Sequence, residues 1–330
     1  MIGFHCLGGP GFSKRTVIRM YYRPLNMEEH SRSTTHKSIQ GCILVTMNVL
    51  AICGNSFVCW AVYRKRKNLT VPYLYVLALA VSDLMVAICC FPFCIQAFLE
   101  DGWIHGYDLC QFNGFLIYYW GGISVPTLAL TAVNRYFRMV KAHIYPNYFT
   151  IKSSVFMILA VWVLTLFDGF LSTFVGPVIY EYDARFFFCI GTFSSKKHER
   201  AIGISLHLIH VFIPLIIIVY CYANVFRTVR QHNANVGPSL RAGQRRQVAM
   251  NAWELRVTKL LFLVVLGFFV CWIPVIIIGI LAHSSTVKLP DFAPELYTVL
   301  AFTSAVINPL IYGVANRDFR REFLGSFQCR

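Results

Sequence analysis

The sequence predicts an all-α membrane protein, a bundle of seven transmembrane helices followed by a short amphipathic eighth helix. Composition is the first observation behind this fold class: 57% of the 330 residues are hydrophobic and 14% are charged, against roughly 25% charged in an ordinary soluble domain. The second is that apolar runs longer than about 18 residues recur, each long enough to cross a bilayer core about 30 Å thick as a helix. A soluble chain of this size could not bury seven such runs.

The apolar runs place the spans, in order, at 38–63, 73–99, 109–139, 153–176, 202–228, 255–282 and 294–314. We therefore divide the chain into an N-terminal segment (1–37), the seven-helix domain (38–314) and an amphipathic helix with a tail (315–330). In the last part Phe319, Phe323 and Phe327 recur every four residues with charges between them, which is typical of a helix lying in the membrane interface. Cys329 beyond it is either a palmitoylation site or a free thiol.

The N-terminal segment is polar and contains no apolar core of a signal peptide, so we expect the first span to act as its own insertion signal. Met27 is an alternative start. Lys and Arg predict the orientation: nineteen lie in one set of loops and ends, and five lie in the opposite loops. The first set is then cytoplasmic, the N-terminus extracellular and the C-terminus cytoplasmic, although six basic residues in the N-terminal segment argue weakly against this.

The formal charge of +15 does not indicate nucleic-acid binding, because no basic face of a soluble fold is present to carry it. The basic residues fit the membrane reading instead, and we expect the lipid bilayer rather than nucleic acid as a partner. Cysteine spacing also excludes a zinc site, because no CxxC pairs with a second one.

Polar residues inside spans are expensive and are therefore site candidates. Asp83 lies midway along the second span, and Asn55, Ser124 and Asn308 lie at similar depth in other spans. Carboxylate, hydroxyl and amide oxygens suit a hard cation, and a hydrogen-bonded network with water and no ion is an equal alternative.

Two charges lie at the cytoplasmic ends of the third and sixth spans. Arg135 ends one and Glu254 opens the other. A pair between them could tie the two helix ends together, and breaking it would let the helices part. The alternative is two unrelated interfacial charges.

The motifs of the chain, taken in order, resemble those of the rhodopsin-like G-protein-coupled receptors over about residues 38–327. The matching residues are Gly54-Asn55, Leu79 to Asp83, Trp103 with Cys110, Asn134-Arg135-Tyr136, Trp162, Pro214 with Tyr222, Cys271-Trp272-Ile273-Pro274 and Asn308-Pro309-Leu310-Ile311-Tyr312. Each motif is weak alone, and the full set at the right spacing is a strong signal.

The resemblance implies roles for single residues. Cys110 and Cys189 correspond to the family disulfide, on the face that is oxidising by topology. Asp83, Ser124 and Asn308, with Asn55 nearby, correspond to an allosteric sodium pocket.

Further roles concern activation. Trp272 corresponds to the pivot under the ligand, and Arg135 to the arginine that leaves Glu254 and meets the G protein. Tyr222 and Tyr312 correspond to tyrosines that stabilise the open cytoplasmic face. This chain departs from the family at Asn134, where an acid is usual, so Arg135 loses a local carboxylate and Glu254 carries more of the restraint.

Within the family that the chain resembles, two kinds of receptor are excluded because their ligand-binding residue is missing here. Opsins attach retinal to a lysine where this chain has Phe302, and amine receptors use an aspartate where it has Ile117. We therefore expect neither a light sensor nor a monoamine salt bridge.

The closest local resemblance is to melatonin receptors, which also carry Asn-Arg-Tyr and match His210 and Gly279. The pocket departs from them: their hydrogen-bonding or packing residues fall here at Ser172, Gly191, Phe193 and Ile276, and their final motif has Ala at Pro309. A site that loses its partner groups loses selectivity, so we expect a melatonin-receptor-like protein with a different ligand.

The polar candidates near the pocket are His207, His210 and Asp168. We favour ligand contact for His210, leave His207 open between ligand contact and packing, and expect Asp168 slightly more as a helix–helix hydrogen bond than as a ligand contact. An aromatic lining would suit a flat, mostly apolar ligand; its members are Tyr118, Tyr119, Trp272 and Phe302.

The expected function is that of a multi-pass plasma-membrane receptor without enzyme activity or cofactor. It would bind a small extracellular ligand and activate a heterotrimeric G protein, with a weak preference for the inhibitory type from the melatonin resemblance. The alternatives are a transporter or channel, for which apolar residues and Tyr312 close the path beneath Asp83, and an intramembrane enzyme, for which no HExxH or GxSxG motif is present.

Overall fold

The computed structural model describes residues 34–175, 178–193, 208–234, 242–282 and 289–315. Within these ranges seven helical segments are long and apolar enough to cross a membrane: Thr34–Arg64, Val71–Leu99, Gly106–Val140, Ile151–Thr173, Ile209–Gln231, Glu254–Ala282 and Ala293–Val314. They agree with the seven predicted spans and confirm the fold class. The predicted eighth helix, Cys329, His207 and Met27 lie outside the described residues.

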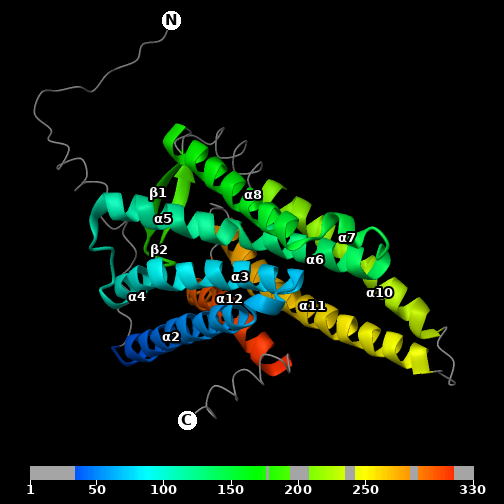
Figure 1. Cartoon of the computed structure of the whole chain (residues 1–330). Coiled ribbons are helices and arrows are strands. Elements are labelled where there is room, and N and C mark those ends of the chain that lie inside the picture. Colours follow the sequence, from blue (N-terminus) through cyan, green and yellow to red (C-terminus); the bar gives the residue numbers. More distant parts are fainter. Residues whose placement is uncertain (1–33, 176–177, 194–207, 235–241, 283–288, 316–330) are drawn as a thin grey trace, which may run out of the picture. The chain divides into compact units, whose positions relative to one another are not determined.

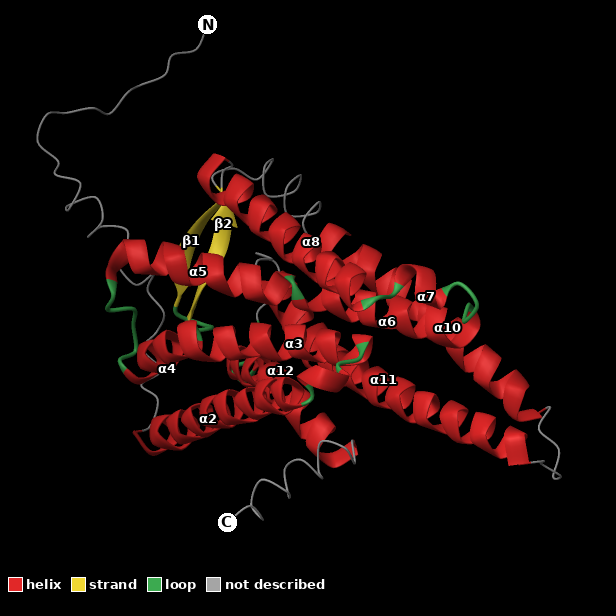
Figure 2. Ribbon diagram, in the orientation of Figure 1, coloured by secondary structure: helices red, strands yellow, loops and turns green. Residues whose placement is uncertain are grey.

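Figures 1 and 2 show the helices that make up these spans, with one small sheet beside them. In chain order the elements are α2 (Thr34–Arg64), the 3₁₀ turn η1 (Arg66–Asn68), α3 (Val71–Cys89), α4 (Phe91–Leu99), α5 (Gly106–Gly122), α6 (Ser124–Val140), α7 (Tyr145–Tyr148), α8 (Ile151–Phe170), the π-helical η2 (Leu171–Val175), β1 (Val178–Asp183), β2 (Phe188–Phe193), the π-helical η3 (Leu208–Phe212), α10 (Ile213–Ala234), α11 (Ala242–Ala282) and α12 (Ala293–Ala315).

Prolines account for several irregularities of the spans. Pro92 and Pro126 lie in the first turns of α4 and α6, just after breaks in the second and third spans, and Pro214 follows the π turn η3. Proline cannot donate the helical backbone bond, so a break or widened turn before it is expected. Pro274 and Pro309 lie inside α11 and α12.

The helices pack around two large clusters of buried residues and two smaller ones. α11 lies along α12, α6 lies along α10, and α3 contacts α5, α6, α8 and α12. α8 exposes large apolar side chains, among them Phe156, Leu164 and Phe167, which are 73%, 66% and 62% exposed. In a soluble protein such a face would be a liability, and in a bilayer it contacts lipid.

An antiparallel hairpin closes one end of the bundle, which we call the hairpin end. β1 pairs with β2 from Val178↔Phe193 to Asp183↔Phe188, and a disulfide joins Cys189 on β2 to Cys110 on α5, with the Cα atoms 5.6 Å apart. The disulfide predicted from the family resemblance is confirmed. The hairpin itself was not predicted.

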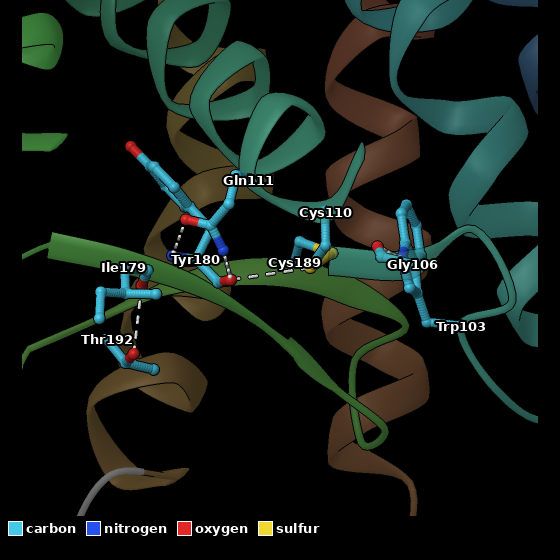
Figure 3. The surroundings of a disulfide bond; sticks show 8 residues. All are labelled: Trp103, Gly106, Cys110, Gln111, Ile179, Tyr180, Cys189 and Thr192. Atoms are coloured by element: carbon cyan, nitrogen blue, oxygen red, sulfur yellow. Dashed lines mark hydrogen bonds between the residues drawn. A yellow bond between two sulfur atoms is a disulfide. The ribbon is translucent and has the colours of Figure 1, made fainter. Parts of the chain in front are cut away.

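Side-chain contacts seat the hairpin on α5, as Figure 3 shows. The Gln111 side chain donates to the Tyr180 carbonyl and accepts from the Tyr180 backbone N–H, the latter at 3.0 Å. Gly114 permits this approach, because an added Cβ would lie 2.5 Å from the Tyr180 ring. Burial of that ring also raises the pKa of the Tyr180 hydroxyl.

Candidate functional site

A cavity of about 70 Å³ lies in the bundle toward the hairpin end, with room for several water molecules. Most of its wall is apolar, and Asp83, Ser124 and Ser304 contribute polar groups at its inner part. The full lining is Asp83, Val86, Phe91, Ile117, Trp120, Gly121, Ser124, Phe188, Ile190, Phe268, Trp272, Val275, Tyr297, Ala301, Ser304 and Ala305.

The hairpin contributes to the cavity wall through Phe188 and Ile190 of β2. Phe186, Phe187 and Phe188 are 1%, 3% and 5% exposed and pack among residues of the second, sixth and seventh spans. Phe187 has a φ of 61°, an uncommon conformation for a non-glycine residue. The Thr298 hydroxyl donates to the Phe186 carbonyl at 3.1 Å, so α12 holds the turn in place.

An arginine fastens the same turn to α11. Arg185 donates to the Ala282 carbonyl at 3.0 Å and pairs with Asp183 at 2.6 Å. Hydrogen bonding to the Asp183 carboxylate raises the pKa of Arg185 above its usual value. The hairpin that contributes to the cavity wall is therefore linked to the ends of α11 and α12.

The predicted ligand residues divide into two groups. Ile117 and Trp272 line the cavity. Phe302 does not line it: its ring is fully buried and stacks on Phe91 with 3.8 Å between centroids. Gly279 is also absent from the lining, and its nearest neighbour is the Tyr297 ring, 3.8 Å from where a Cβ would lie.

His210 and Asp168 also lie away from the cavity lining, where they contact each other. His210 Nε2 and Asp168 Oδ2 are 3.0 Å apart, and the Tyr118 hydroxyl donates to the same oxygen at 2.8 Å. The three side chains join the fifth, fourth and third spans. Asp168 thus makes the helix–helix hydrogen bond that the sequence favoured over a ligand role.

Of the polar residues predicted to lie around Asp83, Asn308 contacts it directly and Ser124 lines the same cavity. Asn308 Nδ2 donates to Asp83 Oδ2 at 2.8 Å. Asn55 Nδ2 donates to the Ala51 and Ala305 carbonyls, both at 2.9 Å. Among the described residues no group of three His, Cys, Asp or Glu could hold a metal. An ion here would need the neutral oxygens as well, and the unpaired Oδ1 of Asn308 could supply one.

The opposite end of the bundle, which we call the Arg135 end, contains a closed charge pair. Arg135 Nη1 donates to Glu254 Oε2 at 3.0 Å, with 1% and 12% of the two side chains exposed. Arg135 also donates through Nε to Asn134 Oδ1 at 3.1 Å. The predicted pairing between the third and sixth spans is therefore present, and Asn134 supplies a neutral acceptor where an acid is usual.

The other predicted coupling residues surround this pair. Tyr222 and Tyr312 are 3% and 1% exposed and belong to one buried group at the Arg135 end. The Tyr136 ring lies 5.9 Å from that of Tyr220. Pro309 packs directly against α2, because a Cβ added to Gly54 would lie 2.8 Å from its Cγ.

Two residues at this end were missed by the sequence analysis. Arg138 Nε donates to Glu254 Oε1 at 2.7 Å, and the Tyr145 hydroxyl accepts from Asn134 Nδ2 at 3.1 Å. Helical spacing could have indicated Arg138, because residues three apart share a helix face. For Tyr145, in the short helix α7 between two spans, the sequence carries no comparable signal.

Comparison with known proteins over most of the chain agrees with the fold and the site described above. A model of the rhodopsin family of seven-transmembrane receptors matches residues 54–312. Melatonin receptor type 1A-A of Danio rerio is 31% identical over 291 residues, covering 86% of this chain and 79% of that protein. Melatonin receptor type 1A of Mus musculus is 30% identical, covering 85% and 78%. Squid rhodopsin shares the fold, with a TM-score of 0.77 and 22% identity over 89% of this chain and 86% of that one.

The chain belongs to the rhodopsin family of seven-transmembrane receptors, which are not enzymes. Its motifs, span number, disulfide and closed Arg135–Glu254 pair all agree with this class. Within it, the chain is a G-protein-coupled receptor of the melatonin receptor type.

Proposed function

We propose that this receptor spans the plasma membrane with the hairpin end outside and the Arg135 end in the cytoplasm. Support comes from the basic residues, which concentrate in the loops at the Arg135 end. The hairpin end carries the disulfide Cys110–Cys189, and disulfides persist on the oxidising side of a membrane.

The ligand we propose is small, compact and mostly apolar, and it binds in the cavity under the hairpin. Ile117, Trp272 and Phe188 would contact its apolar body. Asp83 and Ser124 are among the few polar residues in a mostly apolar lining, so a ligand with a single hydrogen-bonding group is favoured.

Melatonin itself is not the ligand we favour. The curated relatives carry its name, but His210, the histidine matching theirs, is engaged with Asp168. Ser172, at the position of their asparagine, donates to carbonyls of its own helix at 2.9 and 3.1 Å.

The observation that carries the coupling proposal is the contact between the cavity and the span that bears Glu254. Trp272 lines the cavity and stacks on Phe268 one turn earlier, with 5.6 Å between ring centroids. Both lie on α11, whose opposite part bears Glu254. A ligand that moves Trp272 would therefore act on the helix held by Arg135, and release of Glu254 would open the G-protein site.

Asp83, Ser124 and Asn308 would hold an allosteric sodium ion, whose charge would favour the closed arrangement while it is bound. We further propose an inhibitory G protein as the partner, following the resemblance to melatonin receptors.

The test is nucleotide exchange on a purified inhibitory heterotrimer by the receptor in lipid nanodiscs. A library of small ligands, with melatonin and related indoles included, is screened against the wild type and against Arg135→Ala as the inactive control. Exchange in the wild type alone supports the proposal. Ligand-driven flux of an ion or solute without exchange would favour a transporter or channel.

A further inference from the structure

Five polar side chains close a ring at the Arg135 end. Its members are Asn134, Arg135, Arg138, Tyr145 and Glu254. Arg135 donates to Glu254 and to Asn134, Asn134 donates to Tyr145, and Arg138 closes the ring by contacting both Tyr145 and Glu254. Three members lie on α6, one on α7 and one on α11.

Each oxygen of the Glu254 carboxylate is bound by a different guanidinium. Oε2 accepts from Arg135 at 3.0 Å, and Oε1 accepts from Arg138 at 2.7 Å. Two separate donors fix both the position and the rotation of the carboxylate plane, whereas a single donor leaves rotation free. Arg138 thus fixes the rotation of the Glu254 carboxylate, which Arg135 alone leaves free.

Tyr145 places the Arg138 guanidinium. That group lies over the Tyr145 ring at 5.0 Å from the centroid, a cation–π contact. The Tyr145 hydroxyl is in turn held by Asn134 at 3.1 Å. Arg138 is 38% exposed, so its long side chain would otherwise sample many rotamers in water.

The neutral residue at position 134 explains why a second arginine is useful. A neutral amide can accept from Arg135 and donate to Tyr145 at once, which a carboxylate cannot do. The cost is a missing negative charge, so Glu254 is the only carboxylate among the described residues that pairs with Arg135. The closure then depends on how firmly Glu254 is held.

We propose that Arg138 is a positioning residue that holds Glu254 in register with Arg135 and so restrains ligand-free activation. The inference rests on the proposed coupling role of the Arg135–Glu254 pair. Separation of α11 from α6 breaks both contacts together, because both arginines lie on α6 and their partner lies on α11.

The experiment measures ligand-free nucleotide exchange in nanodiscs for Arg138→Ala, Glu254→Ala and the double variant. Because Arg138 is partly exposed, we expect Arg138→Ala to raise the basal rate by about 2- to 5-fold. In the Glu254→Ala background the same change should have no further effect, because the group that Arg138 positions is gone. Arg138→Lys, which keeps the charge but loses the planar contact with Tyr145, should restore part of the restraint.

Lys152→Ala removes an exposed positive charge near the same membrane face and is the matched control, with unchanged basal exchange expected. Arg138→Gln provides a second variant if the alanine variant folds poorly, as judged by its thermal unfolding. If Arg138→Ala raises basal exchange equally with and without Glu254, the inference is overturned and Arg138 has a merely structural role. The inference is also overturned if Arg138→Ala has no effect while Glu254→Ala raises exchange. No exchange in any variant, Glu254→Ala included, would overturn the proposed function as well.

Discussion

Replacing Glu254 by alanine should activate the receptor without ligand. The substitution removes the carboxylate from a guanidinium that is 1% exposed, and Arg135 keeps only the neutral Asn134 oxygen as acceptor. A buried charge that loses its counter-charge destabilises the closed arrangement, whereas the open arrangement lets Arg135 reach water or the G protein.

The structure sets the magnitude. Glu254→Ala removes two hydrogen bonds, and the buried one to Arg135 dominates over the one to partly exposed Arg138. Its loss costs about 1.5–3 kcal/mol, below the ~3–5 kcal/mol of a fully uncompensated buried charge, because Asn134 still accepts. At about 1.4 kcal/mol per tenfold, the closed-to-open ratio falls roughly 10- to 150-fold. A wild type that is about 1% open would become roughly 10–60% open.

The assay is ligand-free GDP–GTP exchange at matched receptor concentration, with surface expression measured in parallel in cells. Lys259→Ala, which removes an exposed charge from the same helix, is the control. A Glu254→Ala receptor whose basal exchange equals that of the wild type at equal surface expression would refute the reasoning.

Three further outcomes follow from packing and covalent structure. Gly54→Val should destabilise the bundle by about 1–3 kcal/mol through overpacking against Pro309. Adding Pro309→Ala should restore part of the lost stability in thermal unfolding. If stability is not restored, the overpacking is not against Pro309. Cys110→Ser and Cys189→Ser should each lower stability by about 2–5 kcal/mol, and the double variant, measured by the same unfolding assay, should be no worse than either single variant. Asp168→Ala should lower the unfolding temperature but change ligand affinity by less than about twofold, because Asp168 lies outside the cavity lining. A large loss of affinity with unchanged stability would contradict this expectation.

The seven spans could be predicted from the sequence because hydrophobic length is a local property of the chain. The motifs that recur in a fixed order along the chain, such as Asn308-Pro309 before Tyr312, could also be recognised in the sequence alone. The β1–β2 hairpin was not, because each strand is six residues long and gains its stability from the partner strand and from burial against α5.

The candidate sites likewise combine contacts that the sequence predicts with contacts that it does not. The Arg135–Glu254 contact could be foreseen from two charges at the ends of their spans, and helical spacing could have indicated Arg138. Tyr145, in contrast, depends on how the segment after α6 returns to the bundle. His210 was expected at the ligand, and the structure shows its Nε2 on Asp168, 42 residues earlier. Sequence spacing gives no rotamer, so it cannot decide which of two polar partners a side chain meets.

The most direct measurement of the central claim is the separation of α6 from α11 at the Arg135 end. Fluorescent donor and acceptor groups placed at Lys141 and Lys259, both exposed, report that distance in nanodiscs. We expect one short-distance population in the wild type and a second, longer one in Glu254→Ala, growing in proportion to basal exchange. An unchanged distance distribution in a variant whose exchange has risen would contradict the account.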